Sequence, residues 1–175
     1  GSGLVGSEMC IRDSYATYLK RQIQVEAEEK VPEGKMAKLL YDMYQPDCAK
    51  YAVESDVPQI YELLLENFDL QADHIPSEDD LLQIVKEKEV MIYKIGDKIE
   101  CFFIYRREGK KLYCAFSYNH ASADILYSIE RRVKEIEYEE NGIKMHYAWF
   151  NAKNKKALRR NAWKDTKIRD YIFVK

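Results

Sequence analysis

Tyr118, Asn119 and His120 form a run of polar side chains that could take part in acid–base chemistry. An imidazole changes its charge near neutral pH, so His120 could accept a proton from an amine. The simpler interpretation is that Asn119 or His120 caps a following helix, and the two roles are compatible. The run lies between an apolar, strand-like stretch and a helical pattern, and turns at such places often carry functional residues.

The other histidines and the cysteines form no pattern typical of a metal site. His74 precedes Pro76 in a predicted surface loop, and His146 falls in a predicted strand as a core-edge residue. The cysteines have neither C-x-x-C spacing nor a suitably placed histidine. We therefore expect no metal, and free thiols in a reducing compartment, the cytoplasm. The four cysteines are Cys10, Cys48, Cys101 and Cys114.

Charge is spread unevenly, although the net charge of the whole chain is only −2. Residues 54–89 carry eleven acidic side chains against two lysines, and residues 153–175 carry nine basic side chains against two acidic ones. The acidic region suits an amine acceptor and the basic region a phosphorylated ligand, unless both are simply solvated surfaces. The near-neutral total predicts no nucleic-acid partner. No apolar run approaches the roughly 20 residues that span a bilayer, so no membrane partner is expected either.

The length of 175 residues suits one domain with an appendage, and 46% hydrophobic residues exclude a disordered chain. Residues 1–14 lack periodicity and resemble a translated sequencing-adapter read-through of the kind found in environmental sequence sets, so we interpret them as non-native. Residues 15–47 show two short helical patterns, which either cap the main domain or remain from a truncated upstream region. Residues 48–175 form the main predicted domain.

Hydrophobic periodicity in the main domain predicts strands and helices in a definite order. Short links between the three consecutive strands predict an antiparallel meander, and the helix that follows predicts a crossover to a parallel neighbour. The expected elements are a strand at 50–54, helices at 56–68 and 77–88, strands at 90–93, 99–105 and 112–118, a helix at 125–136 ending before Asn141-Gly142, a strand at 144–150, a helix at 153–161 and a strand at 171–174.

This order resembles the GCN5-related N-acetyltransferase (GNAT) family. Residues 51–61 are similar to the family's first strand and helix, and residues 99–104 to its third strand. Asn154 and Ala157 match an N-x-x-A signature that follows the fifth strand. The resemblance covers residues 48–175 and implies an α/β (α+β) fold, in which helices flank a mixed, mostly antiparallel central sheet. It also implies an acyl-CoA-dependent N-acyltransferase that acts on a small-molecule amine or a peptide.

The resemblance also implies where the donor, acetyl-CoA or another acyl-CoA, would bind. Family members bind its pyrophosphate on a glycine-rich turn at the start of a helix, but the matching residues 116–124 contain no glycine. The family's tyrosine acid falls on Asn161. The alternative is therefore a binding or regulatory module that lost this turn. The implied catalytic residues are Tyr118 and His120, and the implied donor-binding residues are Asn119, Ala121, Ser122, Ala123 and Asn154.

Overall fold

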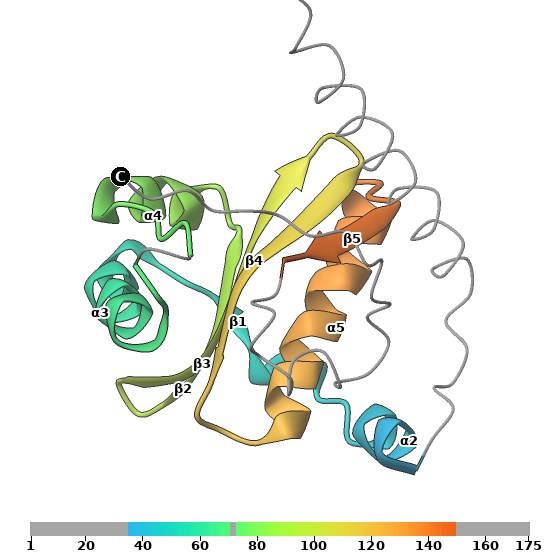
Figure 1. Cartoon of the computed structure of the whole chain (residues 1–175). Helices are drawn as coiled ribbons and strands as arrows, with labels where there is room; N and C mark the ends of the chain where they lie inside the picture. Colours follow the sequence, from blue (N-terminus) through green and yellow to red (C-terminus); the bar gives the residue numbers. More distant parts are fainter. Residues whose placement is uncertain (1–34, 71–72, 150–175) are drawn as a thin grey trace, which may run out of the picture.

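The computed structural model describes residues 35–70 and 73–149, which include five strands and four helices (Figure 1). The helices are α2 (Lys35–Asp42), α3 (Val57–Asn67), α4 (Glu78–Lys86) and α5 (Ala123–Glu140), with 3-10 turns η1 (Pro46–Cys48) and η2 (Glu54–Asp56). The strands are β1 (Lys50–Tyr51), β2 (Val90–Ile95), β3 (Lys98–Glu108), β4 (Lys111–Asn119) and β5 (Met145–Ala148). The elements predicted at 15–30, 153–161 and 171–174 lie outside the described residues.

The strands form one sheet in the order β1-β2-β3-β4-β5. The first four pair antiparallel, and β5 pairs parallel to β4 after the α5 crossover. Gly96 and Gly109 form the two tight turns with φ of 60° and 62°, a conformation that other residues adopt only at a cost. The predicted mixed, mostly antiparallel sheet flanked by helices is therefore confirmed.

Helices cover both faces of the sheet: α3 and α4 lie on one face and α5 on the other (Figure 1). Because successive strand residues point to opposite faces, β3 supplies both cores. Phe102 and Ile104 pack towards α3 and α4, whereas Phe103 and Tyr105 pack towards α5. A side chain on β3 can therefore reach either helical layer.

The helices differ in how their N-termini are capped, and Asp56 at the N-cap position of α3 forms no side-chain cap bond. Ser77 accepts a hydrogen bond from the backbone N–H of Asp80, and Gly142 (φ 60°) follows the last turn of α5. At the start of α5, however, Ser122 occupies the N-cap position without a side-chain cap bond. The prediction that Asn119 or His120 caps this helix is wrong, because Ser122 is the N-cap residue, the Asn119 side chain donates to the Ser122 backbone oxygen, and the His120 ring bonds to Glu100.

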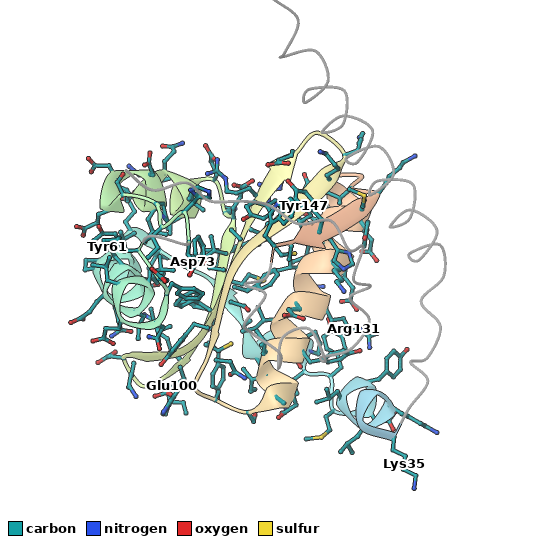
Figure 2. All side chains as sticks on the ribbon, viewed as in Figure 1. Lys35, Tyr61, Asp73, Glu100, Arg131 and Tyr147 are labelled. Carbon is teal, nitrogen blue, oxygen red and sulfur yellow. The ribbon has the colours of Figure 1, made fainter. Side chains whose placement is uncertain are left out.

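The segment from α2 to η1 packs against α5. The guanidinium carbon of Arg131 lies 4.3 Å from the ring centre of Tyr41 and 4.2 Å from that of Tyr44. Tyr44 also donates a hydrogen bond to Glu135, and the backbone N–H of Gln45 donates to Ser128. Figure 2 shows Arg131 on the side of α5 that faces α2. The described part of the predicted 15–47 segment thus contacts the helix that starts beside the predicted site.

The helices of residues 35–70 and 73–149 are all too short or too polar to cross a membrane.

Candidate functional site

A bulge interrupts β4 where its pairing with β5 stops. Cys114 pairs with Tyr105 on β3, and Phe116 pairs with Ile104, so the intervening Ala115 has no partner on β3. On the other edge, the last β4–β5 pair is Cys114 with Ala148. Residues 115–119 therefore present a backbone edge that no described strand covers. Unpaired N–H and C=O groups on such an edge are ready to bind an extended ligand.

Aromatic contacts hold the side chains beyond the bulge. The Tyr118 ring stacks on Phe102 with 5.4 Å between the ring centres, and Phe116 meets Phe68 edge-on at 5.0 Å. Both β4 residues pack on the face that carries α3 and α4. The predicted catalytic residue Tyr118 is thus half-buried beside the open edge, three residues beyond the bulge.

The turn that links β4 to α5 contains an unsatisfied acceptor. The side-chain N–H of Asn119 donates to the backbone oxygen of Ser122 at 3.1 Å, which fixes the orientation of the amide. Its Oδ1 atom is buried and accepts no hydrogen bond from the described residues. Because buried acceptors are normally paired, a ligand that brings an N–H or O–H donor fits this position. An acyl-CoA carries amide N–H and hydroxyl groups along its pantetheine arm, and either group could donate a hydrogen bond to Asn119 Oδ1.

His120 forms a pair with Glu100 of β3. The Nδ1 atom of His120 lies 2.7 Å from Glu100 Oε2, and Lys98 Nζ lies 2.7 Å from Glu100 Oε1. Hydrogen bonds from Lys98 and His120 lower the pKa of the Glu100 carboxyl, which keeps it ionised. The pair fixes the imidazole through Nδ1, while 67% of the side chain remains exposed. Figure 2 shows Glu100 at the end of the sheet where α5 starts.

Sequence analysis did not single out Glu100. The signal was an acidic residue inside the apolar run from Ile99 to Tyr105, where a fully buried strand would have none. A second bulge explains its presence. Tyr93 pairs with Cys101 and Lys94 pairs with Ile99, so Glu100 is the extra residue of β3. Bulges commonly redirect a side chain in this way.

The first turn of α5 adds backbone donors to the same end of the sheet. Ser122 forms no side-chain cap bond there, and the first N–H groups of an α-helix have no intrahelical partner. Asp124 accepts a hydrogen bond from the Gln45 side chain at 3.3 Å. The structure thus brings the predicted residues 118–123 together at one turn, whereas Asn154 lies outside the described residues.

The acidic region from residue 54 to 89 is only partly a solvated surface. Asp56 and Glu89 are buried and lie within ion-pair distance of Lys94, Arg106 and Arg107. Burial of Glu89 raises the pKa of its carboxyl despite the two arginines. Asp56 and Glu89 are therefore neutralised by neighbouring basic side chains. Only the exposed acidic residues between 54 and 89 can attract a cationic ligand.

Three of the four cysteines lie in the described part of the chain. Cys48 and Cys101 are free thiols, and burial raises the pKa of both. Residues 35–70 and 73–149 contain no group of three or more His, Cys, Asp or Glu side chains placed to hold a metal ion. Cys10 is outside this part of the chain.

Comparisons with known proteins find similar structures but no similar sequences. No protein-family model matches the sequence, and no curated protein matches it. An aminoglycoside acetyltransferase from an uncultured soil metagenomic sample, solved in complex with trehalose, superposes with a TM-score of 0.54 at 14% identity, over 73% of this chain and 95% of that chain. Its likeness shows that the two chains share a fold.

Two further structures give lower scores. Rv2747 from Mycobacterium tuberculosis, solved in complex with CoA, matches with a TM-score of 0.48 at 12% identity, over 63% of this chain and 68% of that chain. The ribosomal-protein-alanine N-acetyltransferase of Brucella melitensis matches with a TM-score of 0.49 at 9% identity, over 72% of this chain and 96% of that chain.

Proposed function

We propose that this chain, which has the fold of the GCN5-related N-acetyltransferases, is an acyl-CoA-dependent N-acyltransferase. One observation carries the proposal: the β4 bulge at Ala115 lies where the β4–β5 pairing ends, and residues 115–119 have no strand partner on that edge among residues 35–70 and 73–149. An extended acyl-CoA arm can bind there as an added strand would. Asn119 Oδ1 supports the proposal, since it is a buried acceptor to which no residue in the described part of the chain donates.

The proposed reaction is a direct transfer of the acyl group. The amine nitrogen attacks the thioester carbonyl, the new C–N bond forms, the C–S bond breaks, and CoA leaves with the proton that the amine loses. A backbone N–H near the bulge would hold the carbonyl oxygen as negative charge develops on it. Tyr118 and His120 are the candidate groups for removing the amine proton. Tyr118 lies closer along β4 to the bulge.

Residues of the turn before α5 would bind the donor. Asn119, Ala121, Ser122 and Ala123 lie between the open edge and the first free N–H groups of the helix. Small side chains let a pyrophosphate approach these groups, which favour anions. Asn154 remains a predicted donor-binding residue.

For the acceptor, we propose an amine on a small molecule or a peptide. The exposed acids of α3 and of the loop after it provide negative charge on the face where Tyr118 packs, and negative charge attracts ammonium groups. For the compartment we propose the cytoplasm, because free thiols such as Cys48 persist where glutathione keeps thiols reduced.

A second candidate function is a non-catalytic binding or regulatory module. The observation that favours it is the absence of glycine from residues 116–124, since glycine lets a backbone approach a phosphate most closely. Such a module would keep the fold and bind no acyl-CoA.

Calorimetric titration of the full chain with acetyl-CoA separates the two functions. The enzyme proposal predicts saturable binding, followed by release of free thiol when acetyl-CoA and a panel of amines are supplied together. The Y118F variant should then bind the donor normally and release thiol more slowly. An absence of binding at millimolar acetyl-CoA would rule out the enzyme and leave the module.

A further inference from the structure

One side of α2 is bound to α5 through specific contacts. Leu40 is buried, and the ring centre of Tyr41 lies 4.3 Å from the guanidinium carbon of Arg131. Just beyond the end of α2, Tyr44 donates a hydrogen bond to Glu135. The described residues from Lys35 onward are therefore part of the folded domain, and the inner side of α2 is the side that carries Leu40 and Tyr41.

Another side of α2 presents two large apolar side chains to solvent. Leu39 is 51% exposed and Met43 is 42% exposed. The backbone N–H of Met43 donates to the backbone oxygen of Leu39 at 3.0 Å, so Met43 lies one helical turn beyond Leu39 on the same side. Figure 1 shows α2 at the edge of the molecule, next to the end of α5 where that helix starts. The pair forms a short apolar stripe that a second helix can cover.

This pair is unlike the other exposed apolar side chains in residues 35–70 and 73–149. Single exposed apolar residues are normal on a protein surface. None of the other large ones has a second exposed one four residues away in the described part of the chain, whereas Leu39 and Met43 have exactly this helical spacing. The other exposed residues are Val53, Leu65, Leu70, Ile95 and Trp149.

The sequence that leads into α2 contains a matching apolar stripe. Residues 15–30 lie outside the described residues, and their sequence predicts an amphipathic helix because an apolar residue recurs every four positions. Pro32 and Gly34 interrupt this pattern and leave a link of four residues, 31–34, before α2. Helices joined by so short a link commonly pack side by side and antiparallel. The apolar residues of the pattern are Tyr15, Leu19, Ile23 and Ala27.

We propose that residues 15–30 dock as a helix on Leu39 and Met43 and form an antiparallel helical hairpin with α2. Ile23 and Met43 each lie ten residues from Glu33 in the link, and Ala27 and Leu39 each lie six residues from it. A hairpin centred on the link therefore places Ile23 opposite Met43 and Ala27 opposite Leu39. Residues 15–47 are then a two-helix cap on α5.

A second copy of the chain is the other occupant that this stripe can accept. A stable dimer buries roughly 20–30 residues on each side, far more than the two side chains exposed here. The upstream segment needs no such area, because a short link holds it at an effective concentration of about millimolar or above. The small size of the stripe therefore favours the tethered helix.

Hydrogen exchange of the full chain, followed by mass spectrometry, tests the docking. Isolated helices of roughly this length are marginally stable in water, so slow exchange over residues 15–30 requires packing. We expect these amides to exchange about tenfold faster in L39Q/M43Q than in the wild type, as docking is lost. L65Q is the matched control: Leu65 is 46% exposed on α3, and its replacement should leave exchange over residues 15–30 unchanged.

Substitutions within the segment supply a reciprocal test. I23Q removes the residue that lies opposite Met43 and should have the same effect as L39Q/M43Q. R21Q changes a residue on the other side of the predicted helix and should leave exchange unchanged. Slow exchange over residues 123–140 in every variant verifies that the domain remains folded.

Three results would overturn the proposal. Fast exchange over residues 15–30 in the wild type would show that the segment does not dock. Slow exchange that persists in L39Q/M43Q would show that the segment packs elsewhere. Slow exchange that appears only at high protein concentration, with a dimer mass in light scattering, would make a second copy the occupant. All measurements are made without ligand, so none of them depends on the proposed acyltransferase activity.

Discussion

The two ends of β3 carry similar charged side chains in opposite surroundings. At one end, Arg107 binds Glu137 of α5 through two hydrogen bonds of 2.7 Å, and Glu137 is fully buried. At the other end, Glu100 binds His120 through one hydrogen bond, and most of the imidazole is exposed. Both pairs link β3 to a neighbouring element. Only the second leaves a charged group with an open side for a ligand.

The buried end is more completely bonded. The Glu137 carboxylate also accepts a hydrogen bond from Asn141 at 2.9 Å, and Glu89 accepts one from the Arg107 backbone at 2.8 Å. Arg106 Nε lies 2.8 Å from Glu89 Oε2 as an ion pair that lacks hydrogen-bond alignment. Buried charges with this many partners stabilise a particular arrangement of sheet and helix. The comparison therefore assigns a structural role to one end and a binding role to the other.

Replacement of Arg107, at the buried end of β3, should cause the largest loss of stability. R107M leaves Glu137 buried without its cation, and breaking a buried pair in this way costs about 3–5 kcal/mol. Urea unfolding of R107M should show this loss in the free energy of unfolding. The double variant R107M/E137M replaces the pair by apolar side chains, and it should recover most of the lost stability.

The matched control is R132A. Arg132 pairs with Glu135 on the surface of α5 at 3.7 Å, and such exposed pairs contribute at most about 1 kcal/mol. If R107M and R132A cost the same, the distinction between a structural and a binding end loses its basis.

Substitution of the turn glycines at the two ends of β3 should lower the free energy of unfolding by similar, intermediate amounts. Gly96 and Gly109 both have positive φ near 60°, and a Cβ atom added at either would meet no atom within 4 Å. The cost of G96A and of G109A should then be the backbone cost alone, about 1–2 kcal/mol each. Thermal or urea unfolding of the two variants measures it. A difference between them well beyond this range would show that the ends differ in their turns as well as in their charges.

Glu100, at the exposed end of β3, should contribute least to stability, and its contribution should disappear in acid. The pKa of Glu100 is lowered in the folded state, so its contribution is present above the unfolded carboxyl pKa of roughly 4.3 and is lost as the pH falls through the folded value. E100Q should therefore lower the free energy of unfolding slightly at neutral pH and flatten its decline below about pH 5, so that variant and wild type converge in acid. Chemical unfolding at several pH values tests this prediction. A strong destabilisation by E100Q at neutral pH would give Glu100 the same structural role as Glu137.

Much of the fold could be predicted from the sequence, because hydrophobic periodicity and turn-forming residues are local signals. Short links between three strands predicted the meander, and Asn141-Gly142 predicted the end of α5. The parallel return of β5 followed from the intervening helix. Strand 50–54 was predicted too long: only Lys50 and Tyr51 pair with β2, since the chain turns at η2.

The candidate site was harder to predict, because it depends on pairing between strands. Tyr118 to Ala123 were found as a strand-to-helix turn, and the structure places them there. The bulge at Ala115 leaves no mark in the local sequence, and the bulge at Glu100 leaves only an acidic residue in an apolar run, since an extra residue is recognised only against its partner strand. For the same reason the Glu100–His120 pair, whose members are twenty residues apart, could not be derived from spacing.

The central claim is that acyl-CoA binds along the open edge of β4 up to the start of α5. Backbone amide NMR of the full chain during titration with CoA tests it most directly. The account predicts that the largest shift changes fall on residues 115–124, with smaller ones at Lys98 and Glu100. Saturable changes confined to the buried end around Arg107 and Glu137, or no changes at millimolar CoA, would contradict it.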